Sequence, residues 1–85
     1  MGRIKALLQQ KDFEGALALA RQLLASRPRH VGGLSAAATA TFALRRDQEA
    51  LDYIRKALYI QPESAALKES LRRIQKRIDE NSSSS

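Results

Sequence analysis

This 85-residue sequence contains an internal repeat. Sliding the chain against itself so that Ala16 falls on Ala50 aligns six identical pairs; we call this displacement the repeat shift. The pairs are Ala6 with Ala40, Ala16 with Ala50, Leu17 with Leu51, Arg21 with Arg55, Leu24 with Leu58 and Pro28 with Pro62. A period of this length, about 34 residues, is typical of helix hairpins stacked in a solenoid, where each unit covers the apolar face of its neighbour. The repeat therefore predicts an all-α fold of stacked antiparallel hairpins.

The apolar residues inside each copy follow a helical period. In the first copy, one helical face is made by Ala16, Leu17, Ala20, Leu23 and Leu24. The second copy repeats it with Ala50, Leu51, Ile54, Ala57 and Leu58. Each copy is therefore expected to bury one side of a helix.

Two prolines and two aspartates mark the element boundaries. Pro28 and Pro62 cannot continue the helices that precede them. Asp12 and Asp47 come just before apolar segments and are predicted to cap them. We expect helices near residues 2–10, 13–27, 31–45, 48–60 and 63–80.

The second helix of each copy resembles that of a tetratricopeptide repeat. The resemblance rests on Asp12-Phe13-Glu14-x-Ala16-Leu17 with Ala20, Leu23-Leu24 and Pro28, and on Ala50-Leu51, Ile54, Ala57-Leu58, Ile60 and Pro62. In the first helix of the second unit, Leu34, Ala38 and Thr41 stand where the family prefers Trp, Gly and Tyr. The resemblance covers about one and two-thirds repeats and implies a short right-handed solenoid of about five helices.

The resemblance also implies a domain organisation and a site. Residues 1–80 would form one domain, with repeat 1 at about 1–30, repeat 2 at about 31–64 and a capping helix at about 63–80. Residues 81–85 would form a disordered Ser-rich tail. In this family the first helices of successive repeats line a concave groove, whose inward positions map onto Lys5, Gln9, Ser35, Thr39, Phe42 and Arg73. The implied function is a non-catalytic scaffold that binds a peptide or a partner protein.

The charge balance points to an acidic partner. Fifteen Lys and Arg against nine Asp and Glu give a formal charge of +6, which attracts acidic peptides, nucleic acid or anionic surfaces. A nucleic-acid site would use Arg72, Arg73, Lys76 and Arg77, although no aromatic side chain lies among them for base stacking. A further alternative is self-association through the solenoid ends, because arrays of fewer than about three repeats are rarely stable alone. A repeat array this short is also expected if the chain is a fragment of a longer solenoid protein or is engineered.

Two of the expected helices have unusual compositions. Residues 31–45 are rich in small side chains, which suits either tight packing between repeats or a groove floor that admits a peptide backbone. Gly32 and Gly33 predict that the first turn frays or begins late. Residues 63–80 carry one apolar seam, which suits a capping helix or a coiled-coil stripe that pairs with another chain. The seam consists of Leu67, Leu71, Ile74 and Ile78.

The sequence contains no pattern of a catalytic or metal site. There is no Cys, and the single imidazole, His30, follows Pro28 in a connection where it is expected to be a loop or cap residue. No nucleophile motif and no Gly-rich phosphate loop is present. We therefore expect no enzyme activity, no cofactor and no metal. No apolar run approaches the roughly 20 residues that span a bilayer, and a cytoplasmic protein is expected.

Overall fold

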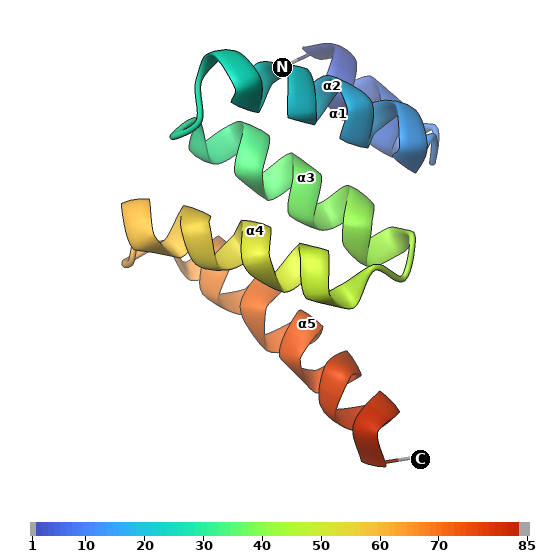
Figure 1. Cartoon of the computed structure of the whole chain (residues 1–85), viewed down its shortest axis with the longest axis vertical. Helices are drawn as coiled ribbons and strands as arrows, with labels where there is room; N and C mark the ends of the chain where they lie inside the picture. Colours follow the sequence, from blue (N-terminus) through green and yellow to red (C-terminus); the bar gives the residue numbers. More distant parts are fainter. Residues whose placement is uncertain (1, 84–85) are drawn as a thin grey trace.

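The computed structural model describes residues 2–83 and, within that range, contains five α-helices and no strand. The helices are α1 (Gly2–Gln9), α2 (Phe13–Ser26), α3 (Val31–Ala43), α4 (Asp47–Ile60) and α5 (Ala65–Ser83). Each helix packs against the next one along the chain as its antiparallel neighbour (Figure 1). The predicted all-α fold of five sequential helices is confirmed. Among the described residues, no helix is both long enough and apolar enough to cross a bilayer.

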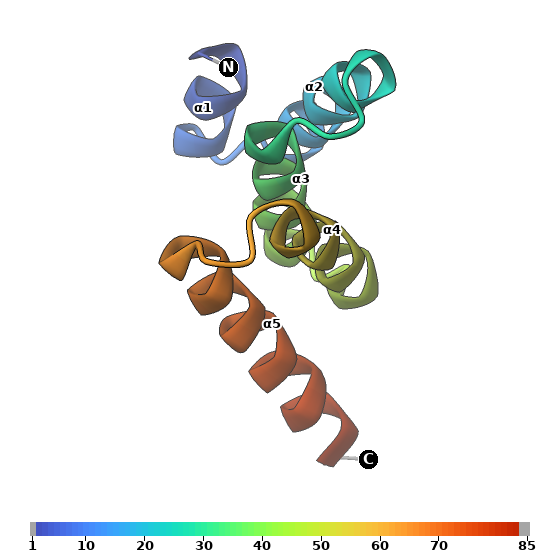
Figure 2. The ribbon, with the colours of Figure 1, turned by 90° about the vertical axis from the view of Figure 1, so that its left-hand side faces the viewer.

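The five helices are arranged with α3 in the middle of the molecule. In side view, α2 and α4 lie on one side of the molecule and α1 lies on the other, whereas α5 begins on the α1 side and crosses diagonally below α4 (Figure 2). Helix α3 contacts α1, α2 and α4, and more of its residues are buried than in any other helix. The C-terminal end of α5 extends beyond the other helices (Figures 1 and 2), while Arg77 and Asn81 contact Asp47 at the start of α4. Because α3 is central, its side chains help to form both the core and one outer face.

The turns within the two hairpins share one backbone geometry. Lys11 and Arg45, which the repeat shift superimposes, have φ angles of 63° and 65°. The N–H of Asp12 donates to Leu7 O at 2.8 Å, and that of Arg46 donates to Thr41 O at 2.8 Å. A hydrogen bond from the N–H of residue i+5 to the C=O of residue i, with residue i+4 in the left-handed conformation, is typical of a Schellman motif at a helix C-terminus.

The helix ends before the two prolines also match under the repeat shift. The N–H of Arg27 donates to Leu23 O at 2.8 Å, and that of Gln61 donates to Ala57 O at 2.9 Å. Arg27 and Gln61 have similar non-helical backbone angles, because a following proline disfavours the helical conformation. The sequence repeat is therefore also a repeat of backbone structure.

The core is built from equivalent positions of the two copies. Ala16 and Ala50 are both 0% exposed. Leu17 and Leu51 are both buried, and Leu24 packs against the core clusters on both sides of α3. The predicted apolar faces of α2 and α4 thus point inward.

The small side chains of α3 are used for close packing. Four of its alanines are buried between neighbouring helices, namely Ala36, Ala37, Ala38 and Ala40. A Cβ atom added to Gly33 would lie 3.1 Å from Leu23 Cδ2, so the α3 backbone approaches α2 closely at this point. The fully buried Thr41 donates its hydroxyl to Ala37 O at 2.7 Å and leaves no polar atom unsatisfied. Tight packing between the hairpins is confirmed.

The predicted cap at Asp47 is wrong. The N-cap of α4 is Arg46, which makes no side-chain capping bond, and Asp47 is already the first residue of the helix. In the first copy, Asp12 does cap α2, because its Oδ1 accepts from Gly15 N at 3.1 Å. The carboxylate of the second copy stands one residue later in the same turn, where it faces Arg77 of α5 instead.

The late start predicted from Gly32 and Gly33 is wrong, since α3 begins at Val31. His30 is its N-cap, and His30 Nδ1 accepts from Gly33 N at 2.9 Å. This bond satisfies an amide that the glycine-rich first turn would otherwise expose.

The terminal helix lies slightly later in the sequence than predicted. Ser64 caps α5 by accepting from Leu67 N at 3.3 Å, so the helix begins at Ala65 instead of 63. It runs to Ser83, whereas the sequence predicted an end near 80 and a disordered tail from 81. The last two residues of that predicted tail lie outside the described residues. In the apolar seam, Leu67 and Ile74 are buried, and Leu71 and Ile78 pack at its edge.

Candidate functional site

Five of the six predicted groove residues line two hollows that share Thr39. Lys5, Ser35 and Thr39 line a hollow of about 320 Å³ between α1 and α3. Thr39, Phe42 and Arg73 line a smaller hollow of about 100 Å³ between α3 and α5. The two hollows meet at Thr39, and all of their lining residues come from α1, α3 and α5. We call the two hollows together the groove.

The α1–α3 hollow combines small and aliphatic side chains. Gly32 and Ala36 of α3 lie on one side of it, and Ile4 and Leu8 of α1 lie on the other. Small residues let a ligand backbone come close, and the aliphatic wall suits an apolar ligand side chain. The sixth predicted residue, Gln9, is exposed in the last turn of α1 and lines neither hollow.

The α3–α5 hollow is more polar. Phe42 and Ala38 of α3 face Ser70, Arg73 and Ile74 of α5 across it. A guanidinium and a hydroxyl beside an aromatic ring can hold a carboxylate and pack against its carbon chain. This end of the groove therefore suits an acidic side chain.

The helices that form the groove are more basic than the helices behind them. Together α1, α3 and α5 carry seven basic and three acidic side chains, whereas α2 and α4 carry three basic and four acidic ones. Helix α3 itself carries no charge. The field in front of the groove is therefore positive, and it favours an anionic ligand.

The guanidinium of Arg73 is only loosely held by its neighbours. Its Nε lies 3.5 Å from Glu69 Oε1, and the same carboxylate also accepts from Arg72 Nη1 at 3.1 Å. The Arg73 side chain is 71% exposed, so this pair is strongly screened by solvent. Arg73 can therefore exchange its contact with Glu69 for a ligand carboxylate at little cost.

A cluster around Arg77, which was not expected from the sequence, lies beside the α3–α5 hollow. Arg77 Nε donates to Asp47 Oδ1 at 2.8 Å, and Arg77 Nη2 donates to the same oxygen and to Phe42 O. The Arg77 guanidinium also lies 3.6 Å from the centroid of the Phe42 ring. Asn81 Nδ2 donates to the other oxygen of Asp47 at 3.3 Å. We call Arg77, Asp47, Phe42 and Asn81 the latch.

One signal in the sequence could have revealed this cluster. The repeat shift aligns the capping Asp12 with Arg46, not with Asp47, so Asp47 is out of register for a cap. Nothing in the sequence, however, indicates that its partner is Arg77. The pairing depends on where α5 crosses the start of α4.

The basic residues of α5 do not form one continuous patch. Arg72 and Arg73 pair with Glu69, and Arg77 packs inward against α3 and α4. Lys76 lies on the outer face of α5. This division argues against the alternative of a nucleic-acid site on these four cations, because Arg72 and Lys76 share the outer face of α5 whereas Arg77 packs inward.

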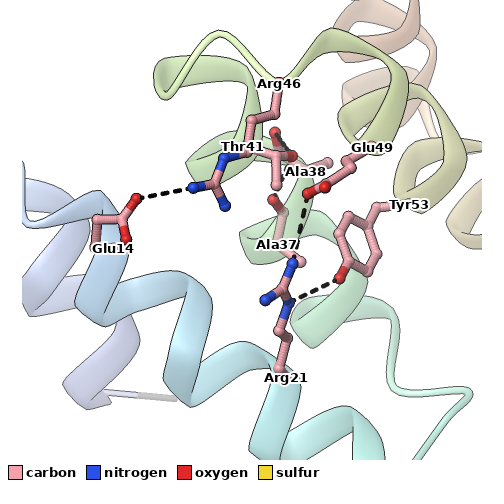
Figure 3. A network of polar contacts seen from close by, with 8 residues as sticks. All are labelled: Glu14, Arg21, Ala37, Ala38, Thr41, Arg46, Glu49 and Tyr53. Carbon is pink, nitrogen blue, oxygen red and sulfur yellow. Dashed lines mark hydrogen bonds and ion pairs between the residues drawn. The ribbon is translucent and has the colours of Figure 1, made fainter.

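A second set of polar contacts lies on the α2 and α4 side (Figure 3). Arg21 Nε donates to Tyr53 Oη at 3.4 Å, and Arg21 Nη2 lies 3.5 Å from Glu49 Oε2. Arg46 Nη2 lies 3.3 Å from Glu14 Oε1. The hydrogen bond to Tyr53 raises the pKa of Arg21 above its ordinary value. These exposed contacts tie the two hairpins together, and each contributes at most about 1 kcal/mol.

Within residues 2–83, no group of three His, Asp or Glu side chains lies close enough to hold a metal ion. Comparisons with protein-family models, curated proteins and solved structures gave no match. The tetratricopeptide resemblance therefore stays a prediction from the sequence.

Proposed function

We propose that this chain is a non-catalytic scaffold whose groove holds an acidic segment of a partner protein. The observation that carries the proposal is the line of hollows from Lys5 through Thr39 to Arg73, with a cation at each end and an uncharged helix between them. Such a surface suits an extended or helical peptide that has carboxylates near its ends and small or apolar residues in the middle.

We also propose that the fold is a short right-handed solenoid of the tetratricopeptide type. Its support is the agreement between the sequence period and the backbone, because both turns and both proline-preceded helix ends match under the repeat shift. In such a solenoid α5 acts as the capping helix. Its buried seam residues Leu67 and Ile74 are consistent with that role.

The expected affinity is modest. The groove residues with charge are exposed, so each contributes a fraction of a kcal/mol that salt screens. We expect a Kd of about 10 to 100 µM at low ionic strength for a short peptide. Raising the salt concentration should weaken binding without unfolding the protein.

The test is a titration of ¹⁵N-labelled protein with a blocked peptide rich in Asp, Glu and Leu. Amide shifts are expected for Lys5, Ser35, Thr39 and Arg73, on the three helices that line the groove. A matched peptide with Asn and Gln in place of the acids should bind more weakly. Shifts confined to α2 and α4 would refute the proposed site.

Charge-matched variants separate the groove from the overall charge. Lys5→Gln with Arg73→Gln removes one cation from each end of the groove and should weaken binding about fivefold. Arg55→Gln with Lys56→Gln makes the same charge change on α4 and should have little effect. Equal losses in both variants would show that only the net charge attracts the peptide.

Self-association and nucleic-acid binding are the alternatives, and the structure favours each of them less. On the outer face of α5, where a second copy would dock, the lining residues include a single apolar one, Leu71. Five of the seven lining residues are charged, and charged residues are depleted in the core of a stable interface. Light scattering over a concentration series tests the first alternative. Retention on heparin, compared between the protein and its Arg72→Gln, Lys76→Gln variant, tests the second.

A further inference from the structure

The latch joins three helices at one point. Arg77 comes from α5, Phe42 from the last turn of α3 and Asp47 from the first residue of α4. The guanidinium donates its N–H groups to the Asp47 carboxylate and the Phe42 carbonyl, and its Cζ lies over the Phe42 ring, 3.6 Å from the centroid. Lysine could not make this combination, because an ammonium group has neither the fork nor the flat face.

The latch contains the Arg77–Asp47 ion pair, which is the least exposed of the ion pairs found in residues 2–83. The side chains of Arg77 and Asp47 are 21% and 13% exposed, whereas those of the other pairs are between 42% and 76% exposed. Partial burial reduces screening by solvent and salt. The latch should therefore hold its geometry more firmly than the surface pairs do.

Phe42 connects the latch to the groove. Its ring contacts Arg77, and the same side chain lines the α3–α5 hollow together with Arg73 and Ser70. Arg73 and Arg77 are one helical turn apart on α5, so a single docking event places both. Arg73 then borders the hollow, and Arg77 contacts Phe42, whose side chain forms part of the wall of the hollow.

We propose that Arg77 is a positioning residue for the groove. It fastens α5 to the α3–α4 turn and orients Phe42, so that the α3–α5 hollow exists only while α5 is docked. Ligand binding and α5 docking are then coupled, and each must strengthen the other by the same factor. The ligand half of this inference rests on the proposed function, whereas the orientation of Phe42 does not.

The first experiment follows the two phenylalanine rings by NMR. The chain has only Phe13 and Phe42, so Phe13, which packs in the other cluster, is an internal reference. In Arg77→Lys, which keeps the charge, the Phe42 resonances and their NOEs to Ile74 should change while those of Phe13 stay. Arg77→Gln should show the same change. Lys76→Gln, on the outer face of α5, should leave both rings as in the wild type.

The second experiment measures coupling in both directions. Arg77→Lys should lower the affinity for the acidic peptide about fivefold, comparable to the loss of one partly desolvated cation–π contact. Saturating peptide should in turn slow hydrogen exchange of the α5 amides in the wild type. Lys76→Arg is the matched conservative control and should bind like the wild type.

The outcomes separate this inference from the proposed function. Unchanged Phe42 NOEs in a folded Arg77→Lys variant would overturn the positioning role. A changed ring with unchanged peptide affinity would overturn the coupling. If the wild type does not bind the peptide, the proposed function fails. The positioning role is then still tested by the Phe42 NOEs and by the hydrogen exchange of α5, which should be faster in Arg77→Lys than in the wild type.

Discussion

The turn between α1 and α2 and the turn between α3 and α4 have the same backbone but use their aspartates differently. Both turns have a left-handed residue, at Lys11 and Arg45, and the same pattern of hydrogen bonds. Asp12 caps the helix that follows it, whereas Asp47 leaves its helix uncapped and binds α5. Under the repeat shift, Arg77 of α5 corresponds to Ala43 of α3, so the helix that packs next to the first hairpin carries no equivalent cation. The comparison teaches that a repeat preserves the path of the chain while single side chains adapt to what lies next to it.

The largest expected effect tests the alanine packing in the core that the two hairpins share. Ala16→Leu and Ala50→Leu each insert a bulky side chain where there is no exposed surface, and each should destabilise the fold by about 2 to 3 kcal/mol. Urea unfolding followed by circular dichroism measures this. Ala18→Leu, on the exposed side of α2, should cost little. A large cost in only one hairpin would show that the packing is not repeated.

The second-largest expected effect tests the different roles of Asp12 and Asp47 in the two turns. Asp47→Ala removes the charged acceptor of Arg77 and should cost about 2 kcal/mol. Asp12→Ala removes only a cap and should cost about 1 kcal/mol. Chemical denaturation of both variants gives the difference.

Two conservative variants sharpen this second comparison. Asp12→Ser should stay close to the wild type, because serine caps a helix as well as aspartate does. Asp47→Ser should still be destabilised, because its short neutral side chain cannot replace the carboxylate. If Asp12→Ala proved the more damaging alanine variant, the latch would contribute less than its geometry indicates.

The smallest effect tests the common backbone. Lys11→Gly and Arg45→Gly relieve a left-handed conformation that costs L-residues roughly 1 kcal/mol or more, partly offset by the greater freedom of glycine in the unfolded chain. Each should therefore stabilise by about 0.5 kcal/mol, which raises Tm by about 2 to 4 °C in a domain of this size. Lys11→Ala keeps the Cβ atom and should give no such gain. A loss of stability in either glycine variant would contradict the assigned turn.

Much of the fold could be predicted because it depends on local rules. Helix periodicity placed Ala16, Ala50 and their neighbours in the core, and proline chemistry ended α2 and α4 near Pro28 and Pro62. His30 was expected to be a loop or cap residue, and it caps α3. The late helix start predicted from Gly32 and Gly33 was wrong because helix propensity alone takes no account of such a cap.

The candidate site could be predicted only in part. The resemblance selected Thr39 and Arg73, which the structure places in the groove, and also Gln9, which lies outside both hollows. Gln9 is exposed and lines neither hollow, although Leu8 beside it lines the α1–α3 hollow. The role of Arg77 was missed because it depends on the crossing of α5 over parts of the chain that lie far earlier in the sequence.

The sequence alone determined the helical class, the repeat period and the inward faces, because these follow from spacing along one chain. Only the tertiary structure decided which carboxylate caps a helix and which holds α5, and which cation borders the groove and which supports its aromatic wall. Those choices depend on the angle at which one helix crosses another. A shift of one residue on a helix turns a side chain by about 100°, enough to exchange a cap for an anchor.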